Sequence, residues 1–85
     1  MPRADAAEVV VGIVAIELRA SEEQVRSARS FRGELGMDSI ALANIVYALE
    51  EEYDCELAVE GVKRLDTVAD LVRVLLDGGA AGPGR

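Results

Sequence analysis

The stretch Gly36-Met37-Asp38-Ser39-Ile40 decides how this chain folds, because it leads from a long connecting segment into an amphipathic helix. Asp38 is the predicted N-cap of that helix, since a carboxylate there accepts a hydrogen bond from an unpaired backbone N–H. Ser39 then occupies the first turn, where free N–H groups and the helix dipole favour an anion. The chain has no histidine to activate a serine. Ser39 is therefore predicted to carry a phosphate rather than to attack an ester.

The predicted helix continues to about Tyr53 and presents two different faces. Its outward face carries Ile40, Ala43 or Asn44, and Tyr47, apolar and small groups typical of a docking surface. Glu50-Glu51-Glu52 crowd its C-terminal end, where carboxylates oppose the helix dipole. These glutamates either attract a basic partner or form a solvated face, and the residues leave both readings open. The inward stripe consists of Leu42, Ile45, Val46, Leu49 and Tyr53.

Upstream, a first helix is predicted from Ala6 to Leu18, with Asp5 and Glu8 at capping-box spacing. Its stripe comprises Ala6, Val10, Ile13, Val14 and Leu18. Gly12 lowers its helix propensity by about 1 kcal/mol relative to Ala, for which only close packing offers a reason. The connection from 19 to 38 is long for a compact domain. One helical turn is predicted to start at Ser21, with Phe31 anchoring the connection to the core.

Downstream, the pattern predicts a short helix within 59–65 and a last helix that begins at Thr67 or Asp66 and continues to about Leu76, with Thr67 and Asp70 at capping-box spacing. Val68, Leu71, Val72, Leu75 and Leu76 form its stripe. Gly78-Gly79 ends it, and residues 78–85 are predicted to be a disordered tail after a domain of residues 1–77. The fold class is all-α: a bundle of three long helices and one short helix, with a long loop between the first two.

Composition restricts the function of the chain. The net charge is −7, and residues 37–66 hold eight acids against two bases. Nucleic acids and anionic membranes require basic patches, so basic proteins are the expected partners. Cys55 excludes an internal disulfide and is predicted to be a small buried hydrophobe. Without a signal peptide, a membrane span, a metal-ligand cluster or a catalytic triad, a cytoplasmic monomer that is not an enzyme is expected.

Three segments carry a resemblance to the acyl carrier protein family. They are Phe31-Arg32-Gly33-Glu34-Leu35-Gly36-Met37-Asp38-Ser39-Ile40, Ala48-Leu49-Glu50-Glu51-Glu52-Tyr53-Asp54 and Leu65-Asp66-Thr67-Val68-Ala69-Asp70-Leu71. The similarity extends without a gap from about Ala6 to Leu76. The pattern Leu-Gly-x-Asp-Ser-Leu/Ile is specific when it stands at a loop-to-helix junction in a small acidic chain.

The resemblance implies a carrier whose Ser39 is esterified with 4′-phosphopantetheine from coenzyme A by a phosphopantetheinyl transferase. The arm would hold cargo as a thioester for an acyl- or aminoacyl-loading enzyme and a downstream transferase or synthase. It also implies partner contacts at Asp38, Ile40, Asn44, Tyr47, Glu50 and Glu51.

The sequence departs from the usual fatty-acid carrier in three places. Ala41 and Asn44 stand where acids are common, Ala58 replaces a frequent proline, and Lys63-Arg64 are basic. These changes favour a discrete carrier of polyketide or related specialised-metabolite, antibiotic-type biosynthesis. The alternatives are a peptidyl carrier, a fatty-acid synthase carrier and an unmodified helical interaction module. A cargo pocket lined by Leu49, Val62 and Leu65 is a further hypothesis.

Overall fold

The computed structural model of the chain describes residues 6–57 and 64–76, and these residues form five helices. No strand is present in those ranges, so the all-α prediction is confirmed. The elements are α1 (Ala6–Leu18), α2 (Glu22–Ser27), α3 (Phe31–Glu34), α4 (Ser39–Tyr53) and α6 (Val68–Val74).

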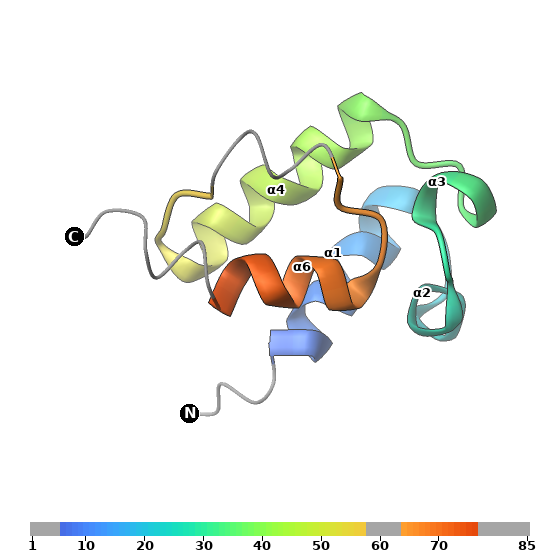
Figure 1. The fold of residues 1–85 in the computed structure, drawn as a ribbon, viewed down its shortest axis with the longest axis horizontal. Helices are drawn as coiled ribbons and strands as arrows, with labels where there is room; N and C mark the ends of the chain where they lie inside the picture. The colour runs from blue at the N-terminus through green and yellow to red at the C-terminus, as the bar shows by residue number, and fades with distance from the viewer. Residues whose placement is uncertain (1–5, 58–63, 77–85) are drawn as a thin grey trace.

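Helix α1 is the element around which the others pack. It contacts α4, α6 and α2, and Figure 1 shows α2 and α3 together at one end of the molecule. The core lies where α1 meets these neighbours. Its fully buried side chains include Val10 and Val14 from α1, Ile45 and Leu49 from α4, Phe31 and Leu71.

The predicted bounds of α1 are confirmed, but the buried stripe is broader than predicted. Val11 and Ala15 are buried, while Ile13 and Leu18 are only partly buried. Because α1 packs against α4, α6 and α2, these helices bury a wider part of its surface than one narrow stripe. Gly12 has no packing reason, because a Cβ built there meets nothing closer than Glu22 Oε2 at 4.0 Å.

The connection between α1 and α4 is more ordered than predicted. The turn expected at Ser21 is present as α2, whose N-cap forms a capping box with Gln24. α3 was not predicted; it begins at Phe31, which is fully buried and so confirms the expected anchor. Ser30 caps α3 by accepting a hydrogen bond from Gly33 N at 2.9 Å. Helical periodicity does not reveal a helix of one turn.

Two predicted core residues are exposed. Tyr53 is the last residue of α4, and Leu76 lies beyond the end of α6. A residue at a helix end has helical neighbours on one side only, so spacing overestimates its burial. The N-cap role of Thr67 is confirmed, and Leu65 is buried.

Several predictions fall outside the described residues. They are the Asp5 cap, Ala58, most of the short helix within 59–65 with Val62 and Lys63, the Gly78-Gly79 stop and the tail 78–85.

Candidate functional site

Ser39 is the first residue of α4, a helix of 15 residues. Asp38 has extended backbone, and its Oδ1 accepts a hydrogen bond from Ala41 N at 2.8 Å, which confirms the predicted cap. The Asp38 carbonyl accepts from Leu42 N at 2.9 Å. Ser39 is exposed, and within the described residues its hydroxyl makes no hydrogen bond. The hydroxyl is therefore accessible, at the positive end of a long helix dipole.

The turn before Ser39 is held by a single carbonyl group. Phe31 O accepts hydrogen bonds from Leu35 N at 2.9 Å and from Met37 N at 3.1 Å. Between them Gly36 adopts φ +72°, a left-handed conformation that favours glycine. Met37 is buried in the core. The turn that leads to Ser39 is thus fixed on both sides of Gly36.

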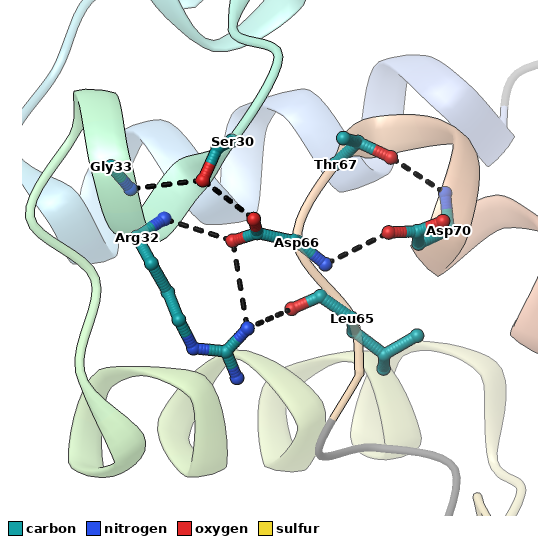
Figure 2. A network of polar contacts seen from close by, with 7 residues as sticks. All are labelled: Ser30, Arg32, Gly33, Leu65, Asp66, Thr67 and Asp70. Carbon is teal, nitrogen blue, oxygen red and sulfur yellow. Dashed lines mark hydrogen bonds and ion pairs between the residues drawn. The ribbon is translucent and has the colours of Figure 1, made fainter.

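Asp66 connects this region to the start of α6 (Figure 2). Its carboxylate accepts hydrogen bonds from Ser30 Oγ at 2.6 Å and Arg32 N at 2.9 Å. The Arg32 guanidinium lies 3.6 Å from Asp66 Oδ1. On the backbone, Phe31 N donates to Asp66 O at 2.7 Å. Phe31, whose carbonyl holds the turn before Ser39, is therefore itself held by Asp66.

The charge on Asp66 is stabilised by these donors. Partial burial raises the pKa of Asp66. The hydrogen bonds from Ser30 and Arg32, together with the charge of Arg32, lower this pKa by more than burial raises it, so the net shift is downward. On the other side, Asp66 N donates to Asp70 Oδ2 at 2.9 Å (Figure 2). We call Ser30, Arg32 and Asp66 the clamp. It joins α3 to the N-terminus of α6.

Helix α4 presents an exposed face beginning beside Ser39. Ile40 is 73% exposed and Tyr47 is 63% exposed. With Asn44 and Glu51 these residues follow one another at spacings of four, three and four, so they lie along one side of the helix. The Glu51 carboxylate raises the pKa of Tyr47 by hydrogen bonding and by its charge, with a smaller effect from Glu50.

Two of the predicted partner contacts have hydrogen bonds within the chain. Asn44 Nδ2 donates to Glu17 Oε2 of α1 at 3.0 Å. Glu50 Oε2 accepts from Leu57 N at 2.8 Å. These bonds neither establish nor contradict a contact with a partner, so the roles of Asp38, Ile40, Asn44, Tyr47, Glu50 and Glu51 remain predictions.

A hollow lies at the far end of α4, lined by Glu50, Glu51, Asp54, Cys55 and Glu56. It differs from the predicted cargo pocket, because Leu49 and Leu65 are buried in the core and do not line it. Cys55 is partly buried and packs against the core. Burial, then the charges of Glu50 and Asp54, raise the pKa of its thiol. A thiol kept protonated is a poor nucleophile, which agrees with a structural role.

Sequence reasoning missed the clamp and the bridge between Asn44 and Glu17. Both join residues far apart in the chain, 36 residues for Ser30 and Asp66 and 27 for Asn44 and Glu17. Periodicity has no signal for such pairs. The described residues contain neither a cluster of three potential metal ligands nor a helix long and apolar enough to cross a membrane.

A family model described as phosphopantetheine attachment site matches residues 8–75. This match covers most of the chain, and the chain belongs to that family. Members carry 4′-phosphopantetheine covalently, as carrier proteins that interact with modifying and synthase enzymes. The residues present fit this group, since an exposed hydroxyl stands at a helix N-terminus suited to a phosphate.

Proposed function

We propose that this member of the phosphopantetheine attachment site family is an acyl carrier protein whose arm is attached to Ser39. It presents biosynthetic intermediates to the enzymes of a polyketide or related specialised-metabolite pathway. The observation that carries the proposal is the exposed Ser39 hydroxyl at the first position of α4, next to the Asp38 cap.

The chain's own contribution to attachment is position and electrostatics. On attachment the Ser39 oxygen would give up its proton and bond to the pantetheine-bearing phosphorus of coenzyme A, while the pyrophosphate P–O bond breaks and adenosine 3′,5′-bisphosphate leaves. Free N–H groups and the dipole at the start of α4 favour the added negative charge. Asp38 already uses Oδ1 to cap the helix. When bound, the arm supplies a terminal thiol that holds the cargo as a thioester.

Catalysis is assigned to the partners. The chain contains no histidine, and the thiol of Cys55 has a raised pKa at the opposite end of α4 from Ser39. Deprotonation of Ser39 is therefore a task for the transferase, and cargo chemistry is a task for the downstream enzymes. The exposed face of α4 and its acidic end are the surfaces proposed to meet them.

The proposal is tested by intact mass after incubation with coenzyme A and a broad-specificity phosphopantetheinyl transferase. The wild-type chain and Ser27→Ala are expected to gain the mass of the arm, and Ser39→Ala is expected to gain nothing. Ser27 is a suitable control because it is exposed on α2, away from α4. A gain that survives Ser39→Ala would refute attachment at this serine. No gain in the wild type would favour an unmodified interaction module.

The class of cargo needs a separate experiment. The protein is isolated from its native host, and the molecule released from the arm is identified. A polyketide intermediate is expected, because α4 has no charged side chain from Ser39 to Leu49 and so differs from the acidic helix of fatty-acid carriers. An amino acid or peptide would favour the peptidyl carrier alternative, and a simple fatty acyl chain the fatty-acid synthase alternative.

A further inference from the structure

The half of α4 nearest Ser39 has an uncharged surface. From Ser39 to Leu49 the helix contains only apolar residues, Ser39, Asn44 and Tyr47. The Asp38 carboxylate is engaged as the N-cap. Between Asp38 and Glu50, a basic partner that approaches along α4 meets no carboxylate of the helix itself. The nearest acids of α4 itself begin at Glu50.

Helix α1 supplies a carboxylate, that of Glu17, beside this uncharged half of α4. Asn44 Nδ2 donates to Glu17 Oε2 at 3.0 Å, which holds the Glu17 side chain against the exposed face of α4. Arg26 pairs with Glu8 and Glu22, and Arg32 pairs with Asp66. Glu17 has no basic partner among residues 6–57 and 64–76, and its charge is available to another protein.

The hydrogen bond also prepares Glu17 for binding. A long side chain loses rotamer entropy when it is immobilised at an interface, and one that is already held loses less.

We propose that the Asn44–Glu17 bridge extends the docking surface of α4 onto α1, and that Glu17 pairs with a basic side chain of the enzymes that act at Ser39. Asn44 then acts through Glu17, by holding the carboxylate in place. The inference rests on the proposed function, and it adds a second helix to the surface that partners recognise. Charge pairs of this kind mainly increase the rate of productive encounter.

The probe is a broad-specificity phosphopantetheinyl transferase with coenzyme A. Glu17→Gln removes the charge but keeps an oxygen that can accept from Asn44. It is expected to lower kcat/KM about three- to tenfold at low salt through KM, and to match the wild type at about 0.5 M salt, where charges are screened. The matched control Glu23→Gln removes an exposed charge from α2 and is expected to change nothing.

Asn44→Ala tests whether Asn44 acts through Glu17. It is expected to lower kcat/KM in the wild-type background and to have no further effect in the Glu17→Gln background. Circular dichroism melts establish that all variants are folded at the assay temperature. Equal kcat/KM for Glu17→Gln and Glu23→Gln at low salt, or a loss that persists at high salt, would overturn the proposal. If Glu17→Gln gains the full mass of the arm on long incubation and Ser39→Ala gains none, the proposed function stands whether or not Glu17 affects the rate.

Discussion

The clamp makes the strongest prediction about stability, because one carboxylate joins two parts of the chain. Asp66→Ala removes the hydrogen bonds from Ser30 Oγ at 2.6 Å and from Arg32 N at 2.9 Å, together with the Arg32 ion pair. A hydrogen bond to a charged group contributes about 1.5–3 kcal/mol. The Asp66 and Arg32 side chains are 28% and 40% exposed, so the ion pair adds little.

Two such bonds counted in full would contribute about 3–6 kcal/mol, but the Asp66 side chain is partly exposed and water can replace part of each bond, so we expect Asp66→Ala to lower the free energy of unfolding by about 2–3 kcal/mol. For a domain of this size that corresponds to a fall in Tm of about 10–20 °C. Asp66→Asn is expected to lose only about 1 kcal/mol, since its amide oxygen and NH₂ can still face Arg32 N and Ser30 Oγ. Thermal and urea unfolding at pH 7, followed by circular dichroism, measure both losses.

The pH dependence identifies the carboxylate charge as the cause. The pKa of Asp66 is lowered in the folded state, so its stabilisation is complete above the unfolded pKa of about 3.9 and is lost as pH falls through the folded pKa. The difference in the free energy of unfolding between the wild type and Asp66→Asn should therefore become smaller at low pH. The control Thr67→Ala removes the hydrogen bond to Asp70 N without touching α3. Thr67→Ala should lower the free energy of unfolding by about 1 kcal/mol, and because Thr67 carries no charge this loss should be the same at low pH. If Asp66→Asn lost the same stability at pH 3 as at pH 7, the reasoning would be wrong.

Three further predictions follow from single positions. Gly12→Ala should raise the free energy of unfolding by about 0.5–1 kcal/mol, because its Cβ has room; an unchanged urea midpoint would contradict this. Gly36→Ala should cost about 1–2 kcal/mol from its φ of +72° alone, since its Cβ meets nothing within 4 Å; a midpoint equal to wild type would rule out that strain. Glu51→Lys should slow transfer to a partner at low salt and leave Tm almost unchanged, whereas Glu50→Lys should also lower Tm because it loses the bond from Leu57 N; equal Tm values would remove the distinction.

The parts of the fold that were predictable are those set by local physics. The bounds of α1 and α4 follow from helical spacing, and the caps at Asp38 and Thr67 follow from side chains that reach a backbone N–H three residues on. Ser39 was placed at the start of α4 for the same reason. Each of these signals lies within one or two turns of helix, so the sequence itself contains it.

The parts that were not predictable depend on tertiary contacts. α3 is a single turn, and its N-cap Ser30 is held by Asp66, a residue just before α6, which itself packs on α1. In sequence, Asp66 is merely one of two candidate starts for the last helix. Glu17 is likewise an ordinary solvent-facing acid until α1 lies against α4. A pairing over such separations is decided by the packing of the helices, not by propensity.

Glu50 and Glu51 show why composition alone left the acidic end of α4 ambiguous. Glu50 accepts a hydrogen bond from Leu57 N and so holds the chain after the helix. Glu51, one residue later and 100° further around the helix, is exposed and interacts with Tyr47 on the exposed face of α4. The same residue type therefore serves structure at one position and presents charge at the next. Glu50 thus has a structural role that neither reading of the cluster included, and reversing the charges of Glu50 and Glu51 together would mix a loss of stability with any effect on partners.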